Sequence, residues 1–187
     1  MLDLSNVKNI IGHLNTVNRH RLTVCRHCFK AGIYWRGLVH DLSKYSPEEF
    51  IPSAVRFQGN RSPNEAEREE YGYSTAWMHH KGRNKHHFEY WTDYSPETRL
   101  MEPVQMPLTY VIEMFCDRVA AGKIYNGDKY TDSSPLEYFN RAKGRRIIEE
   151  NTSKLLEKLL VMLSTEGEEK TFAYIRSLRR RALRRKK

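Results

Sequence analysis

Several features that would place the chain in a membrane or in a secretory compartment are missing. No apolar run approaches the roughly 18 residues needed to cross a bilayer. Residues 1–6 lack the basic start and apolar stretch of a secretory signal. The three cysteines, Cys25, Cys28 and Cys116, are an odd number, which argues against a disulfide framework. We therefore expect a cytoplasmic protein with reduced thiols and no membrane partner.

The motifs that most directly assign a function are absent as well. The sequence has no Walker phosphate loop, no Gly-x-Ser-x-Gly turn and no Rossmann glycine pattern. The segment Cys25-Arg-His27-Cys28 offers two thiols and an imidazole, but a structural zinc site usually needs a second ligand pair, and Cys116 is the only other thiol. We do not expect zinc there.

What is present is a helical pattern in a chain long enough for one domain. Hydrophobic residues make up 39% of the 187 residues and charged residues 29%, which suits a globular protein. Strand alternation and internal repeats are not evident. The sequence predicts an all-α fold, a single compact domain with about seven to nine helices, in which residues 1–122 form the core and residues 123–187 add C-terminal helices packed on it.

Turn signals set the expected helix boundaries. Ser-Pro pairs are typical of helix starts, because serine caps the helix and proline fits its first turn. We expect Trp91 to Met106 to be an ordered loop. The expected helices are Ser5 to Ala31, a short one through His40 and Asp41, one from Ser46-Pro47, one from Ser62-Pro63 to about Lys81, Leu108 to Ala121 ended by Gly122, one from Ser134-Pro135, and about 151–164 and 168–181.

The formal net charge is +9, and much of it comes from the basic tail, residues 176–187. Such runs are usually the solvated end of a helix. Weak nucleic-acid binding through this tail stays open as an alternative, since clustered lysine and arginine attract phosphates.

All eight histidines lie in two windows, His13 to His40 and His79 to His87. If the short helix continues through Asp41, then His40, Asp41 and Lys44 share one face. The opposite, apolar face is expected to be buried; it consists of Trp35, Leu38, Val39 and Leu42. Such a helix would present an imidazole, a carboxylate and an amine together.

Asp117 lies in a helical segment that is apolar almost all round, which is typical of a buried helix. A buried carboxylate is costly unless it meets a cation or several donors. Either a salt bridge, for example with Arg118, or a bound metal would satisfy it.

Together these residues resemble the HD-domain superfamily. The resemblance rests on His40-Asp41-Leu-Ser-Lys44, an upstream helical histidine, His79-His80-Lys-Gly-Arg-Asn84-Lys-His86-His87 and the late Asp117, and it covers about residues 13–121. It extends to an uncharacterised bacterial HD-like family with an Asn-x-His-His segment and a Glu-Met-Phe/Leu-Cys-Asp helix, here Glu113 to Asp117. In the superfamily, a histidine, a His-Asp pair and a distant aspartate ligate a metal, and intervening histidines often ligate a second one.

The resemblance implies that residues 1–122 are an HD-like metal-binding core. Its metal would be one or two divalent ions of iron, manganese, zinc, nickel or cobalt. The implied ligands are His20, His40, Asp41, His80, His87 and Asp117. His20 is chosen because it precedes the Gly32 turn by an interval familiar from compact HD proteins.

Geometry leaves parts of this ligand set open. His13, His20 and His27 are seven residues apart and share a helix face, but they lie about 10 Å apart along its axis, so no two reach one ion. Either His79 or His80 could ligate, and on a continuous helix His86 and His87 would be too far from both. The interruption at Gly82 and Asn84 could fold them back. The number of metals stays open for the same reason.

The leading interpretation is a metal-dependent hydrolase of a phosphomonoester or nucleotide, with Asp41 and Lys44 in catalytic roles. The substrate-binding candidates are Lys44, His79, Lys81, Arg83, Asn84 and His86. A di-iron oxygenase of HD type is the first alternative, favoured by the surplus of histidines. A nucleic-acid-binding or regulatory protein with a structural or vestigial metal site is the second. A homodimer is compatible with the sequence, which bears no mark for or against it.

Overall fold

The computed structural model describes residues 4–184 and confirms an all-α fold. Residues 1–3 of the segment examined for a signal and residues 185–187 of the basic tail lie outside the described residues. The α-helices are α1 Leu4–Ala31, α2 Tyr34–Val39, α3 Pro47–Val55, α4 Pro63–Tyr71, α5 Thr75–Arg83, α6 Leu108–Asn126, α7 Ser134–Arg141 and α8 Glu150–Arg184. Short 3-10 helices span Leu42–Tyr45, Phe88–Tyr90 and Gly127–Lys129. No helix in the described part is long and apolar enough to cross a membrane.

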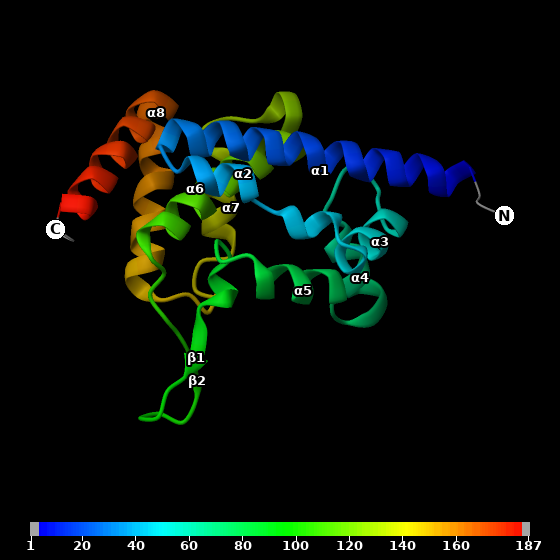
Figure 1. Cartoon of the computed structure of the whole chain (residues 1–187), viewed down its shortest axis with the longest axis horizontal. Helices are drawn as coiled ribbons and strands as arrows, with labels where there is room; N and C mark the ends of the chain where they lie inside the picture. The colour runs from blue at the N-terminus through cyan, green and yellow to red at the C-terminus, as the bar shows by residue number, and fades with distance from the viewer. Residues whose placement is uncertain (1–3, 185–187) are drawn as a thin grey trace.

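The core lies where α1, α6 and α8 meet, and α7 closes it between α6 and α8 (Figure 1). α6 is apolar on nearly every side because it is surrounded by the other helices, as its sequence predicts. Each fully buried leucine or phenylalanine stabilises the fold by about 1.5–3 kcal/mol. The fully buried side chains include Val24, Cys28, Ile112, Phe115, Val119, Leu156, Leu160, Leu163 and Ile175.

α8 is two helical segments joined at a kink, which agrees with the two helices expected there. The kink is at Gly167, whose φ of 79° is a conformation that only glycine adopts easily. Beyond it the chain turns towards the C-terminal end of α1 (Figure 1). There an Arg176 guanidinium nitrogen donates a 2.9 Å hydrogen bond to the Lys30 carbonyl. The end of α8 is thereby fixed to α1.

The expectation of one helix through His40 and Asp41 was wrong. α2 ends at Val39, and Asp41 has a left-handed backbone with φ 52°. The predicted burial was also inverted, because α2 packs on α1 through Gly37, which lies against Cys28. The face predicted to be buried points outward, with Trp35 69% exposed and Leu38 and Leu42 also exposed.

Three other segments differ from the expectation. The helix expected from Pro63 to Lys81 is two helices, separated at Gly72, whose φ is 81°. The expected loop contains an antiparallel hairpin of β1 Thr92–Tyr94 and β2 Met101–Pro103, in which Asp93 pairs with Glu102. α6 continues through Gly122 and ends at Asn126, before Gly127.

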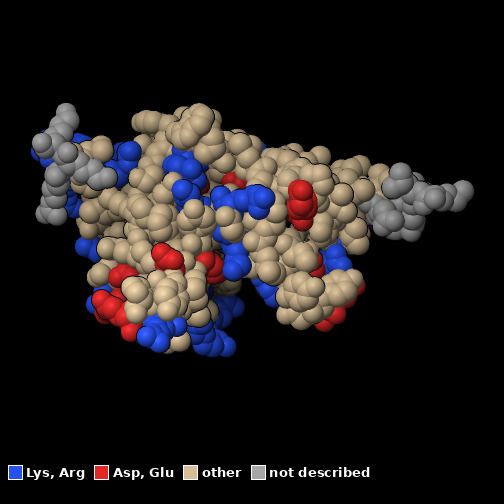
Figure 2. All heavy atoms as spheres, turned by 60° about the horizontal axis from the view of Figure 1, so that its bottom comes forward, with Lys and Arg blue, Asp and Glu red and all other residues tan. Residues whose placement is uncertain are grey.

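The basic residues do not form one continuous positively charged patch on the face shown in Figure 2. There, lysine and arginine side chains alternate with groups of aspartate and glutamate. Of the basic tail, the described residues 176–184 belong to α8, so this part is helical.

Candidate metal centre

The centre is built around Asp41, which lies between α2 and the 3-10 helix Leu42–Tyr45. Its side chain is 1% exposed. Arg21 of α1 fixes the preceding turn, because its guanidinium donates to the carbonyls of His40 (2.7 Å) and Leu38 (3.2 Å). These carbonyls lie at the end of α2, where the helix offers them no backbone donor. α1 therefore holds the turn that presents His40 and Asp41.

The first group of potential metal ligands is His20, His40, Asp41 and Asp117, whose ligand atoms all lie within 4.8 Å of one another. His20 Nε2 is 2.9 Å from Asp117 Oδ1. His40 Nε2 is 3.5 Å from Asp41 Oδ2 and 3.7 Å from Asp117 Oδ1. Three segments far apart in sequence thus present two imidazoles and two carboxylates to one small volume.

The second group is Asp41, His80, His86 and His87, again within 4.8 Å. His80 Nε2 and His86 Nε2 each lie 3.4 Å from Asp41 Oδ1. Residue 84 makes this possible: α5 ends at Arg83, and the Asn84 side-chain amide donates to the His80 carbonyl (2.9 Å). The chain reverses there, so His86 and His87 come back beside His80.

Asp41 belongs to both groups, and its two oxygens face different ones. Oδ2 faces His20 and His40, whereas Oδ1 faces His80 and His86. A carboxylate in this position can bridge two metal ions, which in two-metal enzymes are about 3.5–4 Å apart. Each of the two groups could therefore hold a metal ion.

Unpaired buried atoms support metal binding over a network of hydrogen bonds. Buried polar atoms are normally hydrogen-bonded. Within the described chain, no hydrogen-bond partner is found for Asp41 Oδ1, His40 Nε2, His86 Nε2 or His87 Nε2. All four residues belong to the two ligand groups. Metal coordination would satisfy these atoms, and the residues present fit it.

Two further carboxylates, Glu113 and Glu49, contact histidines of the ligand groups on the ring nitrogen that faces away from the centre. Glu113 Oε1 lies 3.0 Å from His40 Nδ1, and Glu113 also accepts two hydrogen bonds from Arg36, at 2.6 and 3.1 Å. Glu49 Oε2 lies 2.7 Å from His80 Nδ1. A carboxylate on one ring nitrogen fixes the tautomer and directs the other nitrogen to a metal. Although His40, His86 and Glu113 also form a compact trio, we assign Glu113 to this orienting role.

The charges of the cluster are strongly coupled. Burial opposes the charged form of Asp41, but His40, His80 and Lys44 hold its pKa well below the usual value. Burial likewise opposes ionisation of Asp117, whose pKa is lowered by His20 and His40. Both carboxylates are therefore ionised at neutral pH, as metal ligands must be.

Two imidazoles of the second group, those of His80 and His87, favour the neutral form. Burial lowers the pKa of His87 well below its usual value, and the neighbouring His86 and His80 lower it further. Burial also lowers the pKa of His80, and Lys44 acts in the same direction. His40 behaves oppositely: burial disfavours its charge, yet Asp41 and the other carboxylates raise its pKa to about 10. A neutral imidazole is the form that binds metal.

The cluster is most accessible at one side. His20 and Asp117 have side chains 12% and 18% exposed, whereas His40, Asp41 and His86 are almost fully buried. Lys44 Nζ lies 3.5 Å from Asp41 Oδ2, and its side chain is also part-exposed. A ligand from solvent would therefore approach the centre beside this ammonium group.

The structure brings together all six predicted ligands, His20, His40, Asp41, His80, His87 and Asp117. It adds His86, which we expected to bind substrate. None of the other predicted substrate-binding residues belongs to the two ligand groups. His79 Nδ1 is 2.7 Å from Glu49 Oε1, and Asn84 supports the turn. Lys81 is half-buried and Arg83 exposed at the end of α5.

The residues considered as alternative ligands or ion-pair partners lie outside the two ligand groups. His13 packs against Phe50 and Phe57, and His27 stacks on Phe172. Arg118 forms no ion pair with Asp117 in the described chain, and no potential metal-binding group there includes a cysteine.

Sequence reasoning did not assign Glu113, Glu49 or Arg36 to the site. One signal was present for Glu113: it is four residues before Asp117, and residues at this spacing share a helix face. Two acids on one face of a buried helix imply cations or metal beside both. For Glu49 and Arg36, whose partners lie more than 30 residues away, no local signal exists.

Comparison with known proteins places the chain in a family whose function is unknown. Residues 9–162 match the Family of unknown function (DUF5662), so the chain belongs to that family. The matched segment contains every residue of the two ligand groups. No curated protein and no solved structure matches the chain.

Proposed function

We propose that the protein is a metal-dependent hydrolase of a phosphomonoester or nucleotide and that it uses two divalent ions bridged by Asp41. The observation that carries the proposal is the position of Asp41, with one oxygen towards each ligand group. The resemblance to the HD-domain superfamily points to the same chemistry. The nitrogen and oxygen donors suit iron, manganese, zinc, nickel or cobalt.

Bound divalent ions would supply a water of lowered pKa as nucleophile and would bind phosphoryl oxygens. The chain itself contributes charge and holds the ligands in position. Lys44, beside Asp41 on the accessible side, would offset the negative charge of the phosphate. Asp41, ionised at neutral pH, would contribute one oxygen to each ligand group. Glu113 and Glu49 would keep His40 and His80 in position.

The test is phosphate release from p-nitrophenyl phosphate and from a panel of nucleoside monophosphates, with each candidate metal added to chelator-treated protein. Asp41→Asn should lower kcat/KM at least about 100-fold, since it removes the shared carboxylate charge. Asp93→Asn makes the same chemical change on the exposed hairpin and should leave the activity unchanged. Absence of metal-dependent phosphate release over the whole panel would count against the hydrolase.

The same centre supports a second candidate, a di-iron oxygenase of HD type. The observation in its favour is the number of imidazoles, since five histidines contribute to the two groups. Non-haem iron sites that activate oxygen combine imidazoles with carboxylates. Two bound irons, oxygen uptake with a small organic substrate and no phosphate release would favour the oxygenase over the hydrolase.

A further inference from the structure

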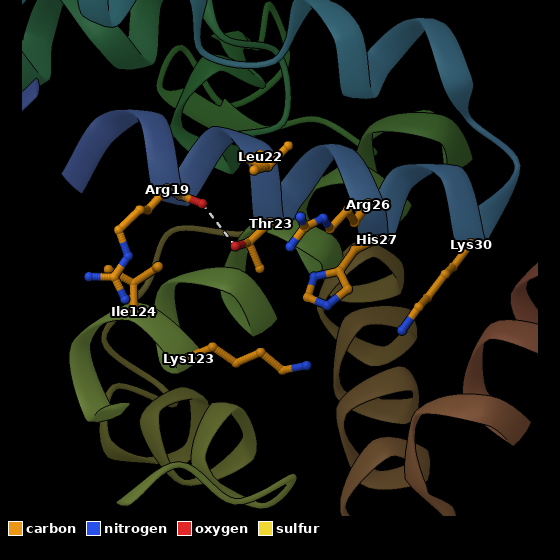
Figure 3. A pocket seen from close by; sticks show the side chains of 8 residues that line it. All are labelled: Arg19, Leu22, Thr23, Arg26, His27, Lys30, Lys123 and Ile124. Atoms are coloured by element: carbon orange, nitrogen blue, oxygen red, sulfur yellow. Dashed lines mark hydrogen bonds between the residues drawn. The ribbon is translucent and has the colours of Figure 1, made fainter. Parts of the chain in front are cut away.

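A second candidate site lies at the interface between α1 and α6, outside the metal cluster. It is a pocket of about 480 Å³, and none of the two groups of metal ligands lines it. Its lining residues are Arg19, Leu22, Thr23, Arg26, His27, Lys30, Lys123 and Ile124. Figure 3 shows that Arg19 extends from α1 towards Ile124 of α6, that Lys30 extends from α1 towards α8, and that Lys123 extends from α6 into the space below His27.

The pocket is strongly and unevenly charged. Its lining contains four side chains that are cationic at neutral pH and no acid. Glu168 of α8 is the carboxylate beside it, and it pairs with both Lys30 (2.7 Å) and Lys123. For Arg19 and Arg26, no ion pair with a carboxylate is found in residues 4–184. Like charges gathered in a concave site repel one another unless an anion joins them, so this arrangement favours an anionic ligand.

A buried polar group inside the pocket points to a ligand independently of the charge. His27 is only 3% exposed, and no hydrogen-bond partner for its Nδ1 is found in the described chain. Its Nε2 lies 3.7 Å from Glu168 Oε1, and its ring stacks on Phe172. The imidazole is therefore fixed in place, and one of its ring nitrogens is not satisfied by any group of the described chain.

The spacing along α1 explains how the pocket forms. Arg19, Thr23, Arg26 and Lys30 recur at intervals of three and four residues, which places them along one side of the helix. From Arg19 to Lys30 this row extends about 16 Å at 1.5 Å per residue, longer than a single phosphate needs. Leu22 and Ile124 add apolar walls.

We propose that this pocket binds a small ligand carrying a chain of phosphate groups, such as inorganic polyphosphate or the phosphate chain of a nucleotide. Guanidinium groups bind phosphate oxygens through paired hydrogen bonds, and Lys30 and Lys123 contribute point charges. The volume suits a small molecule. The apolar walls provide contacts for a nucleoside in addition to the phosphates.

The test is isothermal titration of chelator-treated protein with inorganic tripolyphosphate, at low and at physiological salt. Wild type should bind with one-site stoichiometry, and Arg19→Gln/Arg26→Gln should weaken binding by roughly tenfold or more, because charge-assisted hydrogen bonds are lost. Lys129→Gln/Arg141→Gln lowers the net charge equally at exposed residues outside the pocket and should change the affinity less than about twofold. Circular dichroism confirms that each variant is folded.

No binding by wild type, or the same loss in both double variants, would overturn the proposal. Two sources of the ligand are distinguished with the metal-loaded protein. If Arg19→Gln/Arg26→Gln raises KM for nucleoside triphosphates but not for monophosphates, the pocket holds part of a substrate. If turnover is unchanged while tripolyphosphate binding is lost, the pocket holds a separate anion. Because binding is measured without metal, failure of the proposed hydrolase activity leaves this test intact.

Discussion

Replacing Glu113 with glutamine should weaken metal binding without removing a metal ligand. Glu113 is completely buried and connects Arg36 of α2 to His40 Nδ1. Glutamine keeps the shape but removes the charge that holds the imidazole. Loss of such an orienting carboxylate typically costs 10–100-fold in metal affinity, or about 1.4–2.7 kcal/mol. We expect Glu113→Gln to fall in this range.

The variant should also lose stability in the absence of metal. Removing one partner of a buried ion pair costs about 3–5 kcal/mol, but Arg36 is 23% exposed and glutamine retains a hydrogen-bonding oxygen, so we expect about 1–3 kcal/mol. Affinity is measured by competition with a chromogenic chelator, and stability by urea unfolding in chelator. Glu70→Gln makes the same change in the exposed pair with Arg56 and should leave metal affinity unaltered. A folded Glu113→Gln protein with wild-type metal affinity would refute the orienting role.

Three other changes test separate parts of the structure. Gly37→Ala places a Cβ 2.8 Å from Cys28 Cβ, and this overpacking should lower the free energy of unfolding in urea by about 1–3 kcal/mol. A Cβ at Gly82 would meet no neighbouring group within 4 Å, so Gly82→Ala should be neutral or slightly stabilising. Equal effects of the two variants would contradict the close packing of α2. Burial, and then Lys44, lower the pKa of His13 from 6.5 to about 4, so the unfolded chain takes up this proton first and stability falls as pH drops from 6.5 to 4. His13→Leu should reduce that fall by about 2 kcal/mol between pH 7.5 and 4.5, and an unchanged pH dependence would contradict it. Lys44→Gln should lower kcat/KM for phosphate esters about tenfold or more while metal content stays the same, and undiminished turnover would remove Lys44 from the mechanism.

The helices were predictable where the signal is local. Ser46-Pro47, Ser62-Pro63 and Ser134-Pro135 each begin a helix as predicted, because proline has the backbone angle of the first turn and needs no donor there. Glycine was less informative, since its meaning depends on tertiary contacts. Gly72 ends α4, but Gly122 lies inside α6, where a side chain would come 3.2 Å from Tyr130. It is a packing position and not a stop.

The composition of the candidate site was more predictable than its geometry. The clustered histidines and the buried Asp117 were visible in the sequence, and the structure brings them together. The turn at Asp41 was not visible, because a helical wheel assumes that the helix continues. Arg21, 19 residues before His40, holds that turn open through the His40 and Leu38 carbonyls. A contact over such a distance in sequence leaves no periodic signal.

The burial of α2 was predicted with the wrong face for a related reason. Trp35 and Leu38 were expected inside because they are apolar, yet close approach of two helices requires a small residue at the contact. Gly37 provides it, since its missing side chain allows α2 to lie directly on Cys25 and Cys28 of α1. Side-chain volume, more than hydrophobicity, determined which face of this short helix is buried.

The most direct test of the metal centre is the metal content of protein purified without chelator and without a histidine tag, measured by elemental mass spectrometry. A His40→Ala/Asp41→Ala variant serves as the comparison. The proposed bridging role of Asp41 predicts close to two transition-metal ions per chain in the wild type and a large loss of both in the variant. No metal in the wild type, with none taken up when iron, manganese, zinc, nickel or cobalt is added, would contradict the account.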